Sequence, residues 1–234
     1  LLLYFIEAFM ALGFVNKIYS LKGGFQTFED EKKKNPELVR TIAPYHHITG
    51  VGIDIKKNNI LPIGGISNKL TMYCNENGYF TFFKSDRYGF RGIDNDKNWD
   101  KKLDYLLTGD SQGFGACLHD EDTFVYQISK NTKKKIINIS YSANGPLINF
   151  VSVLEYFNYA KENNLGYPSK VAMVYSEVND LWDLQDELEA PMLQKYLYEN
   201  KIQDIFKKQK KVDELLLSFF NDACENEKLK FAEK

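Results

Sequence analysis

From residue 103 onward, short apolar segments typical of strands alternate with segments of helical periodicity, and this alternation limits the fold more than any other feature. Three apolar segments, 103–108, 135–140 and 171–176, are each followed by a polar cluster. Apolar residues at the spacing of one helix face occur over 147–154 and again over 212–223. Strands separated by helices predict parallel βαβ units, with helices covering both faces of one sheet. We therefore expect an α/β fold.

Composition narrows the functional classes. The chain has 234 residues, of which 44% are hydrophobic and 15% aromatic, so it is long enough to bury a core. Thirty Lys and Arg residues against 32 Asp and Glu give a net charge of −2. This balance argues against a nucleic-acid or anionic-lipid binder, because either needs a concentrated basic face. A mean hydropathy of −0.41 excludes a polytopic membrane protein.

The cysteines do not form a recognisable pattern. Cys74, Cys117 and Cys224 are widely spaced, odd in number and share no Cys-x-x-Cys motif. This predicts neither a disulfide framework nor a zinc site. We expect isolated thiols, reduced or buried.

The amino-terminal segment is the most apolar part of the chain. Its first fifteen residues are apolar or aromatic apart from one glutamate and one glycine, which is too short for a spanning helix of about 20 residues. We interpret it as the second half of a signal-anchor helix, with an amphipathic or buried helix of a soluble domain as the alternative. We also expect the chain to be cut at both ends. The predicted organisation is a partial anchor over 1–16, an amino-terminal region over 17–100 and a catalytic domain over 101–234.

One hairpin is predicted in the amino-terminal region. Two strand-like segments, 70–74 and 79–83, flank the turn sequence Asn75-Glu-Asn-Gly78. The hairpin over 70–83 is expected either beside the main sheet or as a lid over its edge. Trp99 and Trp182 are expected to pack in a core or an interface rather than to line a pocket.

Ser111 is the candidate nucleophile. It follows a predicted strand and Gly109, and it precedes Gly113 and Gly115 at the start of a predicted helix. Small neighbours allow a serine to be exposed on a tight turn, and a helix amino terminus favours negative charge beside it. The sequence also satisfies the loose Gly-x-Ser-x-Gly pattern of a nucleophile elbow. The alternative is a serine that only caps the helix.

Candidate oxyanion donors follow the other two strands. The Asn179 amide can donate to an oxyanion, as can a backbone N–H at Ala143 or Gly145. A nucleophile with convergent donors is what acyl transfer through a tetrahedral intermediate requires. In a parallel sheet these clusters meet outside the carboxyl ends of the strands. An Asx turn formed by Asn179 and Asp180 is the alternative.

These clusters together resemble the SGNH (GDSL) hydrolase family. Gly109-Asp-Ser-Gln-Gly-Phe-Gly115 resembles its first block, Asn138-Ile-Ser-Tyr-Ser-Ala-Asn-Gly145 its second, and Glu177-Val-Asn-Asp180 its Gly-x-Asn-Asp third block. The upstream Ser85-Asp-Arg-Tyr-Gly-Phe-Arg91 is similar to a segment found ahead of the serine in many envelope-anchored members. The resemblance spans residues 85–187 in the family's order and spacing.

The resemblance implies a three-layer α/β/α flavodoxin-like parallel sheet with a small amino-terminal β-containing addition. It implies Ser111 as nucleophile and an oxyanion hole made by the Ser111 N–H, the Ala143 N–H (or Gly145) and the Asn179 side chain. Supporting roles fall to Gly109, Asp110, Glu177 and Asp180. It implies no cofactor and no metal.

The chain departs from the family in two glycines. Ala143 and Glu177 occupy positions where the family has glycine. A backbone donor survives at Ala143, although the approach of substrate is more crowded. The Glu177 carboxylate is expected beside the oxyanion hole, where it binds a cationic or hydroxyl-rich substrate or pairs with a nearby arginine.

The larger departure is the absence of the family's Asp-x-x-His block, whose histidine is the general base. No histidine follows His119, which is eight residues beyond Ser111 and on one helix would lie about 12 Å away along the axis. His46 and His47 precede the sheet, are not expected to act as base, and lack a third spaced ligand for a metal. We therefore expect the chain to end before its base, and to be inactive alone.

The resulting hypothesis is a serine ester hydrolase that acts on an O-acyl ester, including esters on envelope carbohydrate, through an acyl-enzyme on Ser111. The expected location is the bacterial envelope, with the domain tethered to the membrane outside the cytoplasm and with no nucleic-acid partner. Two alternatives remain: an acyltransferase with the same nucleophile, and a degenerate SGNH domain that binds glycan or a protein partner.

Overall fold

The computed structural model of the chain describes residues 24–42, 59–74, 80–176 and 180–232. The chain divides into two compact units, Leu1–Leu38 and Val39–Lys234. The first contains helix α3 (Gly24–Lys34). The second unit therefore includes residues 39–100 as well as the sheet that follows them, and the boundary predicted at residue 100 stays a prediction.

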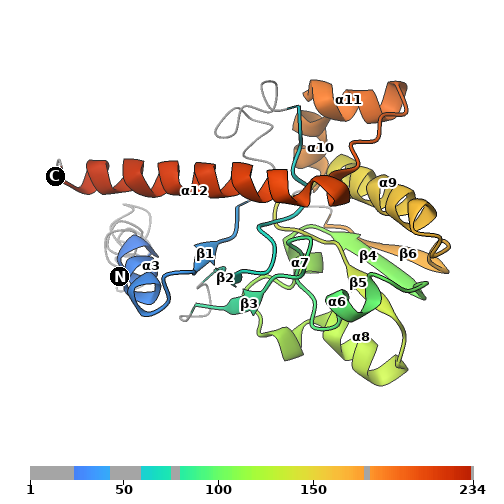
Figure 1. The fold of residues 1–234 in the computed structure, drawn as a ribbon, viewed down its shortest axis with the longest axis horizontal. Helices are drawn as coiled ribbons and strands as arrows, with labels where there is room; N and C mark the ends of the chain where they lie inside the picture. Colours follow the sequence, from blue (N-terminus) through green and yellow to red (C-terminus); the bar gives the residue numbers. More distant parts are fainter. Residues whose placement is uncertain (1–23, 43–58, 75–79, 177–179, 233–234) are drawn as a thin grey trace, which may run out of the picture. The chain divides into compact units, whose positions relative to one another are not determined.

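The second unit is a mixed α/β structure built on a parallel sheet (Figure 1). Its described strands have the order β5 (Ile136–Asn138), β4 (Tyr105–Gly109) and β6 (Lys170–Val174), and both pairs are parallel. The three predicted strands and their parallel arrangement are confirmed. Since all three strands point the same way, the loops that follow them meet at one edge of the sheet.

Helices cover the two faces of this sheet. Helix α9 (Pro146–Glu162) lies over one face, and α6 (Asn95–Asn98) and α8 (Phe124–Thr132) lie over the other (Figure 1). Proline at the first position of α9 suits a helix start, because its missing N–H has no intrahelical partner there. The predicted apolar face of α9 is confirmed at Leu147 and Val151, which are buried. It is wrong at Phe150, which is 43% exposed, and the buried face includes Ile148 instead.

A smaller sheet precedes the parallel one. It has the order β1 (Val39–Arg40), β2 (Leu70–Met72) and β3 (Phe82–Lys84). β2 and β3 are antiparallel, with Met72 opposite Phe82, which confirms the predicted hairpin. Residues 75–79 at its tip lie outside the described residues.

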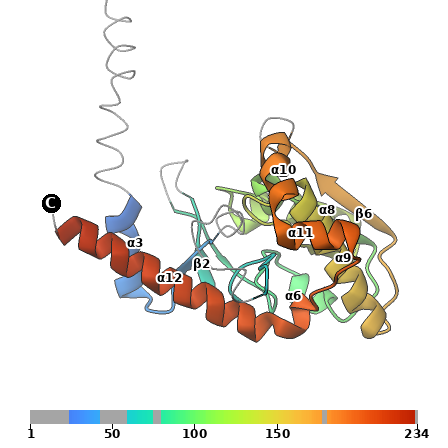
Figure 2. The same ribbon diagram turned by 90° about the horizontal axis from the view of Figure 1, so that it is seen from above.

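Four helical segments follow β6: α10 (Asp180–Glu189), α11 (Pro191–Tyr198), the 3₁₀ turn η2 (Ile205–Lys208) and α12 (Gln209–Ala232). Helices α10 and α11 lie beside α9 (Figure 2). The predicted apolar stripe of α12 is confirmed by buried Val212, Leu216 and Phe220. Asp213, in the first turns of α12, accepts hydrogen bonds from the backbone N–H and the hydroxyl of Ser67, at 2.8 and 2.6 Å. These bonds link the start of α12 to the segment that precedes β2.

The two tryptophans differ. Trp99 is 0% exposed and its ring lies 4.5 Å from that of Tyr88, so the expected packing is confirmed for this residue. Trp182 is 75% exposed, so it does not pack in the core of the chain, and packing in an interface remains a prediction for it. It lies in the first turn of α10, whose buried face is formed by Asp180 and Glu187 instead.

Among the described residues, no helix combines the length and apolar character needed to cross a bilayer. The anchor predicted over residues 1–16 falls outside the described residues.

Candidate active site

Ser111 stands at the point where β4 ends. It is the first residue of α7 (Ser111–Phe114) and is half-buried. Asp110 caps this helix, accepting hydrogen bonds from the N–H groups of Gln112 (2.8 Å) and Gly113 (3.5 Å). The predicted helix is thus present but has only four residues. Its dipole is correspondingly small, because few peptide units are aligned, and the expected contribution of the helix dipole to catalysis is reduced.

The glycines around Ser111 allow α7 to lie close against the strand ends. A Cβ on Gly109 would come within 2.9 Å of the Val174 carbonyl oxygen, and one on Gly113 within 2.6 Å of Ser140 Oγ. Gly115 ends the helix with a φ of +78°, which glycine adopts without strain. Glycine is therefore required at positions 109 and 113 for the Ser111 turn to pack closely against the ends of β5 and β6.

The loop after β5 lies beside this turn. The Tyr141 N–H donates to the Gly109 carbonyl at 3.1 Å, and the Asn144 N–H closes a turn onto the Tyr141 carbonyl at 3.1 Å. Ala143, inside this turn, has a φ of +57°. The left-handed conformation is costly for a residue with a Cβ, by about 1–2 kcal/mol, and such strain is concentrated at functional sites.

The two candidate backbone donors in this loop are not equivalent. The Gly145 N–H donates to the Glu187 carboxylate, which also accepts from Leu147 at 2.7 Å and Ile148 at 3.4 Å. Within the described residues the Ala143 N–H makes no hydrogen bond. Of these two candidates, Ala143 is therefore the one whose N–H remains available to a ligand among the described residues.

Carboxylates surround the same region. Asp180, Asp183 and Glu187 lie on one face of α10, as their spacing of three and four residues requires. Burial raises the pKa of both Asp180 and Asp183, and the charge of Asp110 raises each pKa further. A Cβ on Gly145 would come within 2.7 Å of the Asp183 Cβ, so α10 lies beside the loop after β5. Burial also raises the pKa of Glu187 to about 7.

The third predicted cluster is described only at its end. Glu177 and Asn179 lie outside the described residues. Asp180 is 1% exposed and accepts a hydrogen bond from the Ser176 N–H at 2.6 Å, while its own N–H donates to the Ser176 carbonyl at 3.1 Å. Asp180 thereby closes the connection from β6 to α10, in which Asn179 lies.

The segment Ser85–Arg91 is linked to the Ser111 turn by buried polar groups. Asp86 accepts hydrogen bonds from Asn95 Nδ2 and Trp99 Nε1, both at 2.9 Å. Asn95 in turn accepts from the Asn138 N–H at 3.1 Å, and Asn138 Nδ2 donates to the Gly113 carbonyl at 3.1 Å. This chain of hydrogen bonds runs from the upstream motif to a residue two positions beyond Ser111.

Arg91 holds the loop that follows α7. Its guanidinium donates to the Gly115 carbonyl at 2.7 Å and the Leu118 carbonyl at 2.6 Å, and it pairs with Asp120 at 2.7 Å. The side chain is only 3% exposed, so these bonds are protected from water. The segment Ser85–Arg91 therefore stabilises the Ser111 turn in two ways: Asp86 through Asn95 and Asn138, and Arg91 through the loop after α7.

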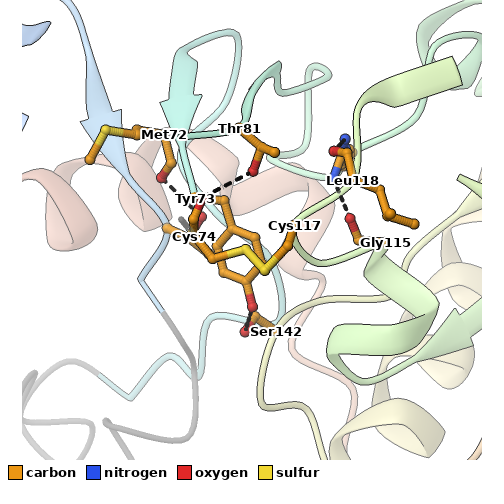
Figure 3. Close-up of a disulfide and its surroundings, with 10 residues drawn as sticks. Met72, Tyr73, Cys74, Thr81, Gly115, Cys117, Leu118 and Ser142 are labelled. Carbon is orange, nitrogen blue, oxygen red and sulfur yellow. Dashed lines mark hydrogen bonds between the residues drawn. A yellow bond between two sulfur atoms is a disulfide. The ribbon is translucent and has the colours of Figure 1, made fainter. Parts of the chain in front are cut away.

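The cysteine prediction is wrong. Cys74 and Cys117, 43 residues apart, form a disulfide that joins the end of β2 to the loop after α7 (Figure 3). Spacing along the chain did not indicate this pair, because only the docking of the hairpin on the Ser111 loop brings them together. The side chain of Cys224 lies outside the described residues.

No histidine base is placed at Ser111 by the described residues. His119 precedes a separate 3₁₀ turn, η1 (Asp120–Asp122), and is exposed. It does not share a helix with Ser111, because Gly115 ends α7 first. His46 and His47 lie outside the described residues. No group of three or more His, Cys, Asp or Glu side chains suited to a metal ion occurs in the described parts of the chain.

Sequence reasoning missed several residues of this site: Tyr73, Asn95, Asp183 and Glu187. Only α10 carried a usable signal, since Asp180, Asp183 and Glu187 recur at the spacing of one helix face. The others act through partners distant in the chain.

Comparison with protein-family models, curated proteins and solved structures yields no match to this chain.

Proposed function

We propose that this protein is a serine ester hydrolase of the SGNH type, acting through an acyl-enzyme on Ser111. The observation that carries the proposal is the meeting of two features at the carboxyl edge of the sheet. Ser111 lies on the turn after β4, and the adjoining loop contains the strained Ala143, whose N–H makes no hydrogen bond to a described residue. A nucleophile beside a pre-formed donor suits acyl transfer.

In the proposed reaction, Ser111 Oγ attacks the ester carbonyl carbon. The oxyanion accepts hydrogen bonds from the Ser111 and Ala143 N–H groups and the Asn179 amide. The carbon–oxygen bond to the alcohol then breaks, the alcohol leaves with a proton, and water hydrolyses the acyl-enzyme. An added base, imidazole in the test below, takes the serine proton, since no described histidine lies at Ser111. We propose that the sheet belongs to the flavodoxin-like three-layer type of the SGNH family.

The charges at the site bear on the substrate. Asp110 adjoins Ser111, and its charge acts on Asp180 and Asp183, so this acidic environment disfavours anionic esters by repulsion. Neutral O-acyl groups, such as those on envelope carbohydrate, suit this environment. The Cys74–Cys117 disulfide supports a location outside the cytoplasm, because disulfides persist in oxidising compartments.

The test is acylation of Ser111 in the purified chain. The protein is incubated with p-nitrophenyl acetate, with imidazole added as an external base, and the acetyl group is located by peptide mass spectrometry. We expect acetyl on Ser111, none there in Ser111→Ala, and unchanged acetylation in Ser218→Ala, which alters an exposed serine of α12. Asn179→Ala is expected to lower the acylation rate by about 100- to 1,000-fold. Equal acylation of wild type and Asn179→Ala would exclude its proposed role.

The absence of acetyl on Ser111 under all these conditions would refute the hydrolase and favour a domain that only binds glycan or protein. An acyltransferase shares the acyl-enzyme. It is distinguished by transfer of the acetyl group to an added sugar in preference to water.

A further inference from the structure

The two residues that directly follow strand β2, Tyr73 and Cys74, contact both loops of the candidate site (Figure 3). Tyr73 Oη and Ser142 Oγ are hydrogen-bonded at 2.7 Å, and the Tyr73 ring packs edge-on against Phe114 at 5.2 Å. The next residue, Cys74, is covalently joined to Cys117. One short segment of the hairpin therefore contacts α7, the loop behind it and the loop after β5.

The hairpin holds this segment firmly. The Tyr73 N–H donates to the Thr81 carbonyl at 2.9 Å, and the Thr81 N–H donates to the Cys74 carbonyl at 3.1 Å. Backbone pairing, a ring contact and a disulfide thus fix the Tyr73 hydroxyl in space. A hydroxyl fixed in this way can determine the conformation of the chain that it binds.

Ser142 directly precedes Ala143, whose φ of +57° is unfavourable for alanine. Such a conformation persists only where its surroundings enforce it. On the other side, Asn144 Nδ2 donates to the Ile63 carbonyl at 3.2 Å. Ala143 is therefore held between two anchored neighbours, and the Tyr73 hydroxyl provides one of the two anchors.

We propose that Tyr73 is a positioning residue of the Ser111 site, which keeps Ala143 in its left-handed conformation and its N–H directed at the oxyanion. The proposal rests on the proposed function. It assigns the hairpin a part in the oxyanion hole, although no residue of the hairpin touches the reacting atoms.

The proposal predicts a specific dependence between residues 73 and 143. Tyr73→Phe removes the hydroxyl and keeps the ring packed on Phe114. In the variant, Ala143 is free to relax towards negative φ, and its N–H turns away from the oxyanion. Glycine adopts positive φ without strain, so in the Ala143→Gly variant the loop no longer needs the Tyr73 hydroxyl.

The experiment is a double-mutant cycle of wild type, Tyr73→Phe, Ala143→Gly and the double variant. Acylation of Ser111 by p-nitrophenyl acetate with imidazole is followed over a range of ester concentrations. We expect Tyr73→Phe to lower the maximal acylation rate about tenfold, with little change in the half-saturating ester concentration, a smaller loss than full removal of a donor. Ala143→Gly and the double variant are expected to acylate at equal rates.

Tyr159→Phe is the matched control, because its hydroxyl contacts Trp99 and Asp100 and not the loop after β5. A wild-type rate in Tyr73→Phe overturns the proposal. So does an equal tenfold loss in both variants that carry Tyr73→Phe, since that result would mean general destabilisation.

A second measurement separates this proposal from the proposed function. The backbone amide resonance of Ala143 is compared by NMR in wild type, Tyr73→Phe and Tyr159→Phe. A shift of this resonance in Tyr73→Phe alone supports the proposal that Tyr73 maintains the Ala143 conformation. The absence of a shift overturns it. If wild-type Ser111 takes up no acyl group, the proposed function fails, while the amide measurement still tests the hold.

Discussion

Replacing Phe114 by leucine tests whether tertiary packing, rather than helix formation, holds the Ser111 turn. Helix α7 has four residues, too few to be stable by itself, so its position depends on packing. Phe114 is 0% exposed and supplies that packing. Its ring lies 5.2 Å from each of three aromatic rings, those of Tyr73, Phe83 and Tyr141, all in edge-on geometry.

The expected loss follows from these three contacts. Each such ring pair contributes about 0.5–1.5 kcal/mol beyond simple burial, so three contribute about 3 kcal/mol. Leucine keeps most of the apolar burial and loses the ring geometry. We therefore expect Phe114→Leu to lower the free energy of unfolding by about 3 kcal/mol.

Urea denaturation measures this loss. Phe150→Leu is the control, because Phe150 is 43% exposed and makes no ring contact in the described residues. It is expected to change stability by less than about 0.5 kcal/mol. Comparable denaturant slopes are needed for the comparison to hold. If Phe114→Leu fell within 1 kcal/mol or so of the control, the argument that ring packing holds α7 would be refuted.

Three further predictions concern pH, the disulfide and the sheet edge. Burial raises the pKa of Glu187 from 4.5 to about 7 and that of Asp86 from 3.8 to about 6. Each neutral carboxyl therefore stabilises the fold at low pH, and this stabilisation is lost as the pH rises through the raised pKa. Between pH 4.5 and pH 7.5, urea unfolding should show a fall of about 3 kcal/mol from Glu187 and about 2 kcal/mol from Asp86, and constant stability would contradict this. Cys117→Ser, which opens a loop closed across 43 residues, should cost about 4 kcal/mol, and a reducing agent should lower the melting temperature of wild type but not of the variant. Met173 is 44% exposed on β6, which is at an edge of the described sheet, so this edge is available for pairing with a second molecule. Met173→Lys should reduce the light scattering that rises with protein concentration. Unchanged scattering would argue against such pairing.

Much of the fold could be predicted because its signals are local. The strands at residues 136–138 and 170–174 lie in apolar segments, and the helices α9 and α12 lie where apolar residues recur at helical spacing. The hairpin followed from two strand-like segments around an Asn-Gly turn. Once the strands are parallel, the loops after β4 and β5 must meet at one edge, so Ser111 and Ala143 could be placed together from sequence.

The details of the candidate site could not be predicted in the same way. Local sequence left Ala143 and Gly145 as alternative donors, and Glu187, about 40 positions further along the chain, engages the Gly145 N–H. Local sequence also did not show that Gly115 ends the Ser111 helix before His119.

The sequence by itself therefore determined the order of strands and helices, the edge of the sheet at which the polar loops collect and the residue types available there. Periodicity and turn chemistry act between near neighbours, and that is sufficient for these features. Only the tertiary structure decided that Cys74 joins Cys117, that Tyr73 binds Ser142 across 69 positions and that Asn95 binds Asn138 across 43. These pairs form because the hairpin and the upstream motif dock on the parallel sheet, and docking depends on the shapes of whole packed surfaces.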